Sequence, residues 1–541
     1  MIKRRIVSIL ALCIAMTVLC SGCAGILWQL AEPLLGTDEV VAFKSMEYTR
    51  PDVRSLETAL ANAQAVAAEE ENPKRVMDAV YDFYEVYDRF YTDYALANIH
   101  YSIDMTDIYW YGEYQFCLEQ ISVADAALDE LYYSLAESPV REELESEEYF
   151  GADFFDAYEG ESIWDETFMA MVDQENQLLN EYYSVTTQAL ETEYYSEEYF
   201  EVYGSQMAEI FVELIALRQQ IAAYAGYDSY PEYAYDMYHY RDYSPDQVEP
   251  YLLQIQEELV DFYRVVNASD LWHTVYEPCS ETDTFRYVKT AAQNMGGDIA
   301  DAFSLLEEGG LYNIAYKENK QETSYVAYLW SYYEPYIFMK PYLDISDHMV
   351  FAHEFGHFVN NYVCWGNYAG TDVAEVHSQA MEYLSLCYTE HGQMLEVYKL
   401  ADTLCTYVEQ AAYALFEQQV YDLTGDDLTV ENVQKLYEQI GREFGFDSCE
   451  WDIRDYVVVS HFYTSPMYIV SYVVSCDIAF QIYQLELAEP GAGLALYEKC
   501  IYSTDGYLML FAESYGLEPP FAEGRLEEVK KTLETGLQNY I

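Results

Sequence analysis

Two histidines four residues apart form the clearest chemical signal in the sequence. They belong to the string His353-Glu354-Phe355-Gly356-His357. On a helix, residues four apart lie on one face, so both imidazoles could bind one zinc ion with Glu354 next to the metal. The alternative is a pair of hydrogen-bonded surface histidines on an amphipathic helix. The spacing favours a metal site on a helix.

A third ligand is expected shortly after these histidines. A catalytic zinc needs three protein ligands and one open position for water. We expect Asp372 to cap a second helix, which places Glu375 in its first turn and Glu382, seven residues on, on the same face. Glu375 is then the third ligand, and Glu382 holds a ligand histidine by its other ring nitrogen. His377 is the rival ligand, but it points to a different side of that helix.

Several separate motifs resemble the thimet oligopeptidase and oligoendopeptidase F family of zinc metallopeptidases, whose zinc motif is of the gluzincin type. The resemblance runs from about Gln206 to Ile482. Its motifs are the segment 226–234, the strand-like Pro335 to Met339, His353 to His357, Ala374-Glu375-Val376 with Ser378 and Glu382, and His461-Phe462-Tyr463 with Tyr468 and Tyr472. The order of these motifs is more specific than the paired histidines alone.

The resemblance implies a mainly helical, two-lobed fold with a deep substrate channel and a small β-sheet next to the zinc helix. We expect an N-terminal helical lobe at 51–300 and a catalytic lobe at 301–541.

The resemblance also implies the roles of the site residues. One Zn²⁺ per chain would be held by His353, His357 and Glu375. Glu354 would be the general base, and His461 with Tyr468 or Tyr472 would bind the substrate and the oxyanion.

Three positions depart from the family pattern. Asn360 stands where many members have a histidine, Val470 where tyrosine is common, and the segment 319–322 lacks a glycine-containing stretch. These departures bear on substrate subsites and turnover, but they leave the metal ligands complete.

The predicted function is that of a zinc-dependent metalloendopeptidase acting on internal bonds of short oligopeptides. In such an enzyme zinc polarises the scissile carbonyl, while Glu354 takes the proton of water and delivers it to the leaving amine. One alternative is a peptide-binding lipoprotein that does not hydrolyse, and another is an exopeptidase on the same fold. Cobalt or manganese could occupy the same ligands in vitro.

The elements that carry these residues are mostly predicted helices. Apolar residues recur three and four apart from about Asp52 to Leu253, with breaks at Asn72-Pro73, Ser138-Pro139 and Ser244-Pro245. The segment 332–342 is the best strand candidate, and its two prolines favour an edge position, where an extended peptide could add as a further strand. The apolar run 456–475 contains polar residues and Pro466, so it predicts a buried helix rather than a membrane span.

The acidic composition excludes one class of partner. The 541 residues include 26 Lys and Arg against 95 Asp and Glu, a net charge of −69, which repels nucleic acids and anionic lipid head groups. The charge could steer basic peptides to the protein, or it could serve solubility alone. We expect oligopeptide substrates and a monomer.

The N-terminus predicts export. Basic residues 3–5 precede an apolar run from Ile6 to Leu19 and a Gly22-Cys23 pair, which resembles a bacterial lipoprotein cleavage site. We therefore expect a signal peptide at 1–22, a lipid anchor on Cys23, a tether at 23–50, and a place on the outer face of the cytoplasmic membrane. An ordinary cleaved signal and an uncleaved anchor helix are the alternatives. Eight further cysteines form no C-x-x-C pair, which suits single buried thiols better than a disulfide framework.

Overall fold

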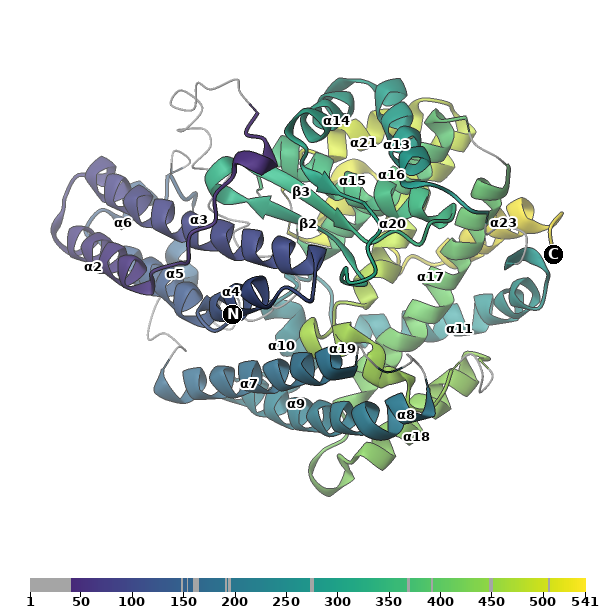
Figure 1. Ribbon diagram of the computed structural model, residues 1–541, viewed down its shortest axis with the longest axis horizontal. Coiled ribbons are helices and arrows are strands. Elements are labelled where there is room, and N and C mark those ends of the chain that lie inside the picture. The colour runs from purple at the N-terminus through teal and green to yellow at the C-terminus, as the bar shows by residue number, and fades with distance from the viewer. Residues whose placement is uncertain are drawn as a thin grey trace.

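The computed structural model describes most of the chain from residue 40 onward (Figure 1). The described residues are 40–541 without the segments 147–148, 153, 159–164, 190–191, 193–195, 273–276, 367–369, 391–392, 447–450 and 505. The predicted signal peptide and the lipid anchor on Cys23 lie outside the described residues, and so does the first part of the tether.

The predicted helices between residues 52 and 253 are confirmed. Asn72 caps a long helix by accepting the backbone N–H of Lys74, and Pro73 is its first residue, where a missing N–H costs nothing. Ser244 and Gln247 form a capping box at the start of another. The helices are α2 (Val53–Glu69), α3 (Pro73–Ile103), α4 (Ile108–Leu118), α5 (Ile121–Ala136), α6 (Arg141–Leu144), α7 (Glu166–Ala189), α8 (Glu197–Tyr199), α9 (Ser205–Tyr224), α10 (Tyr230–Met237) and α11 (Pro245–Asn267).

Buried apolar side chains form two clusters. One contains side chains from Leu56 to Tyr158 and holds α2 to α6 together at one end of the molecule (Figure 1). The other extends from Phe168 to Leu537 and includes a few side chains of α3. Helices on both sides of residue 300 share this second cluster, so the described cores do not mark the lobe boundary expected there, which stays a prediction.

A three-stranded sheet lies next to the helix that carries the paired histidines. Its strands are β1 (Tyr312–Asn313), β2 (Ser324–Leu329) and β3 (Glu334–Met339), in the order β1-β3-β2. β3 pairs antiparallel with β2 along its whole length and parallel with β1 at Ile337 and Phe338. All six residues of β3 are buried.

The expectation that the strand at 332–342 lies at the sheet edge is wrong. β3 is the central strand. Pro335 is tolerated there because β1 is only two residues long and begins opposite Ile337, so no strand needs an N–H from Pro335 on that side.

The remaining helices pack on one another, and among them α15 contacts the sheet. α16 lies between α15 and α20, and both β2 and β3 contact α15 (Figure 1). The small sheet predicted beside the helix of the paired histidines is therefore confirmed. These helices are α13 (Glu281–Met295), α14 (Gly297–Gly309), α15 (Ser346–Cys364), α16 (Thr371–Tyr388), α17 (Gln393–Val420), α18 (Val430–Glu443), α19 (Ser460–Thr464), α20 (Val470–Ala488), α21 (Ala492–Cys500), α22 (Leu508–Tyr515) and α23 (Arg525–Leu537).

The apolar run at 456–475 is not one helix, contrary to the prediction. A 3-10 turn η6 (Asp455–Val458) leads into the short helix α19, and α20 begins only at Val470. Between them Pro466 cannot donate a backbone hydrogen bond, and Met467 has a left-handed backbone with φ of 64°. Among the described helices, none combines the length and the apolar character that crossing a bilayer requires. The described cysteines are all unpaired.

Candidate metal centre and active site

A close crossing of α15 and α16 brings the predicted ligands together. Gly356 lies at the contact, where an added Cβ would stand 2.6 Å from the Cα of Ser378 and 2.7 Å from the carbonyl oxygen of His377. Only a residue without a side chain allows the two helix backbones to approach this closely. This role of Gly356 was missed, although its place between the paired histidines was a signal.

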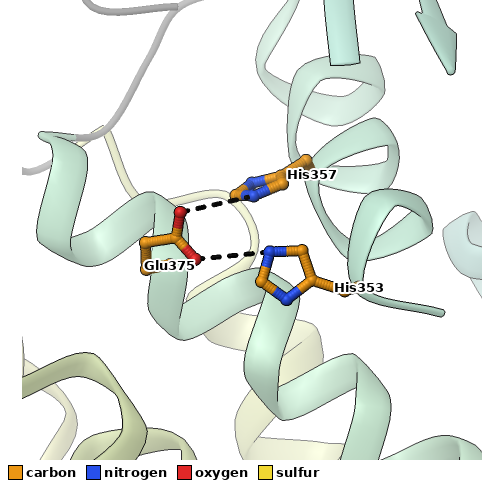
Figure 2. A group of neighbouring side chains, drawn as sticks. All are labelled: His353, His357 and Glu375. Carbon is orange, nitrogen blue, oxygen red and sulfur yellow. Dashed lines mark ion pairs between the residues drawn. The ribbon is translucent and has the colours of Figure 1, made fainter. Parts of the chain in front are cut away.

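His353, His357 and Glu375 form one group. One ligand atom from each lies within 4.8 Å of the others. The Nε2 atom of His353 is 3.4 Å from Oε2 of Glu375, and the Nε2 atom of His357 is 3.8 Å from Oε1 (Figure 2). The two histidine side chains remain 21% and 14% exposed, whereas Glu375 is buried. The open side of the group leaves room for water or a substrate.

Glu382 contacts the ring nitrogen of His353 that does not face Glu375. Its Oε1 accepts a hydrogen bond of 2.8 Å from Nδ1 of His353, and its other carboxylate oxygen is 2.7 Å from Nζ of the buried Lys399. A proton held on Nδ1 leaves the Nε2 lone pair of His353 free for a cation. Burial alone would lower the pKa of His353, but Glu382 and Glu375 outweigh it and raise that pKa to about 9. A positive charge at this position is therefore favourable.

Glu354 lies beside the group and is 6% exposed. Its Oε2 is buried and has no hydrogen-bond partner. Burial raises the pKa of Glu354 to about 8, because the charged carboxylate loses its hydration. Two imidazoles, a carboxylate and an unpartnered carboxyl oxygen next to them fit a zinc ion, whose charge would favour the ionised form of Glu354.

His461, Tyr468 and Tyr472 lie on the side of Glu375. The hydroxyl of Tyr468 donates to Oε1 of Glu375 at 2.5 Å, and the hydroxyl of Tyr472 is 3.3 Å from Nε2 of His461. All three side chains are partly exposed, while the neighbouring Phe462 is buried. Burial lowers the pKa of His461 to about 4, so the ring is neutral at neutral pH and one ring nitrogen carries a proton it can donate.

Asp372 does not cap α16, contrary to the expectation. Gly370 occupies the N-cap position, and the Asp372 carboxylate is instead buried within the fold. It accepts hydrogen bonds from Arg241 at 3.3 Å, Tyr243 at 2.5 Å and Ser471 at 2.5 Å. These contacts attach the beginning of α16, which carries Glu375, to the beginning of α20. Arg241 and Tyr243 were missed; the scarcity of basic residues in this acidic chain was a signal for Arg241, and Tyr243 had none.

The rival ligand and two departures from the family pattern have structural explanations. His377 is fully buried and points away from the metal group, with its ring 5.8 Å from that of Phe511. Asn360 donates to the carbonyl of Ile501 at 2.9 Å and so ties α15 to the end of α21. Val470 is buried in the apolar core. None of the three takes part in the described metal group.

Lys399 and Ser378 complete the polar surroundings of the carboxylates. Lys399 was missed, because Glu396 and Asp402 on either side of it make it look like an ordinary helical charge. Ser378 donates to Oε2 of Glu375 at 3.1 Å and so restrains the carboxylate of that predicted ligand.

Comparison with known families and structures supports the resemblance inferred from the motifs. Residues 43–162 match the peptidase M3 N-terminal domain. No curated protein sequence matches the chain.

Solved structures share the fold over almost the whole chain. A protein assigned as an oligoendopeptidase F is 20% identical, covers 92% of this chain and 99% of its own, and has a TM-score of 0.80. PZ peptidase A, solved with an inhibitor, is 19% identical with the same coverage and TM-score. A protein from Bacillus anthracis assigned as an oligoendopeptidase F is 19% identical, covers 93% and 99% of the two chains, and has a TM-score of 0.77.

Residues 43–162 therefore resemble the peptidase M3 N-terminal domain, and the chain has the fold of the oligoendopeptidase F structures. The family resemblance and the mainly helical fold with a small sheet are confirmed. Together these findings support a metallopeptidase.

Proposed function

We propose that this chain is a zinc metalloendopeptidase that hydrolyses internal peptide bonds of short oligopeptides. The observation that carries the proposal is the group His353, His357 and Glu375 with the unpartnered carboxyl oxygen of Glu354 beside it. The peptidase M3 N-terminal domain and the oligoendopeptidase F fold support the choice of peptides as substrates.

The three ligands would hold one Zn²⁺ through Nε2 of each histidine and the Glu375 carboxylate. Zinc bound there would polarise the scissile carbonyl and lower the pKa of a water molecule. Glu382 keeps the proton of His353 on Nδ1, and Ser378 and Tyr468 restrain the Glu375 carboxylate through hydrogen bonds. Each of these contacts sets the direction of a ligand atom.

Glu354 would move the proton. Its Oε2 has no other partner, so it can accept a proton from the attacking water and then donate it to the nitrogen of the leaving amine. The carboxyl suits the role of base because zinc bound beside it would favour its ionised form, while burial favours the protonated form that then donates to the amine.

His461 and the two tyrosines would bind the substrate. A neutral imidazole and a phenol can both donate hydrogen bonds. Tyr472 contacts His461, and the hydroxyl of Tyr468, which contacts Glu375 in this structure, would turn from that carboxylate to the substrate when it serves as a donor. Such donors stabilise the negative charge that develops on the scissile carbonyl oxygen. Tyr472 orients His461 through their contact, so the pair would act together.

Product analysis tests whether the enzyme cuts internal bonds. We expect the zinc-loaded protein to cleave a peptide that is blocked at both ends, and mass spectrometry should detect two internal fragments. Removal of single residues or dipeptides only from unblocked peptides would identify an exopeptidase instead. Stoichiometric zinc binding without any cleavage of a broad peptide set would identify a binding protein.

We also propose that the protein is a lipoprotein on the outer face of the cytoplasmic membrane, anchored through Cys23. The Gly22-Cys23 pair after an apolar run supports this. Cys23→Ala should move the protein from the membrane to the soluble fraction. If the variant stays in the membrane fraction, the N-terminal segment is an uncleaved helix.

A further inference from the structure

The loop 462–468 lies between the two predicted substrate-binding groups, because it follows His461 directly and ends at Tyr468. Its first three residues are the end of α19, and the rest leads towards α20 without regular helix: Pro466 lacks an N–H and Met467 is in the left-handed region. A non-glycine residue with such a backbone costs about 1 kcal/mol or more and persists only where the surroundings hold it. Something outside the loop must therefore fix its backbone.

Arg218 of α9 holds the first part of the loop. Its guanidinium is 1% exposed and donates to the carbonyl oxygen of Phe462 at 2.9 Å and also to that of Tyr463. Glu175 of α7 balances the charge, with its Oε1 2.7 Å from Nε of Arg218. The end of α19, immediately after His461, is thus bound to two helices that take no part in the metal group.

His239, just after α10, holds the middle of the loop. Its Nε2 is 2.8 Å from the carbonyl oxygen of Pro466, so this nitrogen carries the proton. Nδ1 faces the hydroxyl of Thr371 at the beginning of α16. The ring also lies edge-on to Tyr468, with the centroids 6.1 Å apart. His239 therefore contacts the loop and the helix that carries Glu375.

Glu417 of α17 holds the strained position itself. Its Oε1 accepts the backbone N–H of Met467 at 2.7 Å, and the side chain is 3% exposed. In this buried place water cannot replace the carboxyl as acceptor, so removing it would leave the N–H of Met467 unpaired. Met467 is the residue directly before Tyr468.

We propose that Glu417, together with Arg218 and His239, forms a buried polar cradle that fixes the loop 462–468 and so positions His461 and Tyr468 over the metal group. These are positioning residues, since none of them is placed to touch the substrate. The inference rests on the proposed function for its effect on catalysis, but the structural part stands on the hydrogen bonds alone.

Glu417 offers the sharpest test because two variants of similar size separate its hydrogen bond from its shape. Burial raises the pKa of Glu417 to about 8, so at pH 7 the carboxyl is largely protonated and neutral. Glu417→Gln keeps a neutral acceptor oxygen for the N–H of Met467. Glu417→Met fills the same space without an acceptor. Glu409→Met is the matched control, because it removes another carboxylate of α17, one that accepts a hydrogen bond from Tyr263 of α11.

Hydrogen exchange of the Met467 amide gives a readout that needs neither zinc nor substrate. We expect Glu417→Met to speed this exchange at least about tenfold, while Glu417→Gln and Glu409→Met stay within about twofold of the wild type.

Activity is the second readout. We expect kcat of Glu417→Met to fall about tenfold to a hundredfold at unchanged zinc content and nearly unchanged KM, since the oxyanion donors are displaced, and Glu417→Gln to restore most of it.

Unchanged exchange at Met467 in Glu417→Met would overturn the cradle, and so would a wild-type kcat in that variant. If Glu417→Met does not fold, Glu417→Asp, which withdraws the acceptor by one methylene, must show the same faster exchange. A wild type that cleaves no peptide would refute the proposed function. Hydrogen exchange of the Met467 amide would still show whether the cradle exists.

Discussion

The carboxylate of Glu382 links a predicted metal ligand to a buried lysine. It accepts the Nδ1 proton of His353 at 2.8 Å and contacts Lys399 at 2.7 Å. This arrangement both selects the ring tautomer that presents Nε2 to a cation and makes that nitrogen a stronger ligand. The lysine in turn keeps the carboxylate charged despite its burial, because its positive charge lowers the pKa of Glu382.

We expect Glu382→Gln to bind zinc about tenfold to a hundredfold more weakly than the wild type, because the ligand histidine loses its anionic partner. Zinc affinity is measured by titration against a competing chelator. Glu390→Gln is the control, since Glu390 is exposed at the end of the same region. Equal zinc affinity in the Glu382 and Glu390 variants would show that Glu382 does not act on the metal.

At the scale of elements, the site depends on how closely α15 and α16 cross. The contact at Gly356 leaves no room for a methyl group, since the nearest atom belongs to the backbone of Ser378 at 2.6 Å. Backbone atoms cannot move aside as a flexible side chain does. Any widening of the crossing separates the histidines of one helix from Glu375 on the other.

We expect Gly356→Ala to destabilise the fold by about 1–3 kcal/mol and to lower zinc occupancy. Gly112→Ala is the matched control, because Gly112 is also helical and an added Cβ there meets no atom within 4 Å. Chemical denaturation and metal analysis on both variants give the comparison. A Gly356→Ala variant with the stability and zinc content of Gly112→Ala would contradict the close crossing.

The contact of α17 with the loop before α20 predicts a pH dependence of stability. Glu417 faces the backbone of Met467, the guanidinium groups of Arg218 and Arg241, and Tyr421 nearby. Burial raises its pKa from 4.5 to about 8. The folded state therefore binds a proton that the unfolded state releases, so this group's contribution to stability is full below pH 4.5 and is lost as the pH rises through about 8.

We expect Glu417→Gln to lose less stability than the wild type between about pH 5 and pH 9. The free energy of unfolding, from denaturant titrations at several pH values, provides the measurement. The other titrating groups are the same in both proteins, so the difference between their two curves of unfolding free energy against pH reports on position 417. Parallel curves for the two proteins would mean that Glu417 titrates normally.

Local sequence patterns predicted the elements well wherever the cause is local. Asn72-Pro73 and Ser244-Pro245 start helices through side-chain caps and a fixed proline φ, and the spacing of His353 and His357 follows from one helical turn. The central place of β3 was not predictable from its prolines, because it depends on β1 being too short to reach Pro335. The break at Pro466 was visible, but the apolar residues around it suggested one helix.

At the scale of the whole molecule, the contacts that hold the site come from distant parts of the chain. Arg218 of α9 and Glu417 of α17 form hydrogen bonds with the loop 462–468. Nothing in the sequence around either residue indicates that contact. A single sequence carries no signal for such pairs, since any buried arginine or glutamate would look the same. The group His353, His357 and Glu375 could be proposed from the sequence because the two histidines lie one helical turn apart and Glu375 stands in the first turn of the next predicted helix.

The net charge of −69 gives the molecule a long-range field that attracts cations. We expect kcat/KM for a basic blocked peptide to fall severalfold between about 0.01 M and 0.5 M salt, and kcat/KM for an acidic peptide of equal length to rise. Initial rates at several ionic strengths give both values. If salt has no effect on either peptide, the charge serves solubility alone.

In the proposed mechanism Glu354 acts as the base of a zinc peptidase site formed by His353, His357 and Glu375. The most direct measurement determines zinc content and cleavage of a quenched peptide, blocked at both ends, for the wild type and Glu354→Gln side by side. We expect close to one zinc per chain in both proteins, with internal cleavage by the wild type and a loss of at least about a thousandfold in the variant. A variant that retains wild-type cleavage, or a wild type that binds no zinc, would contradict the claim.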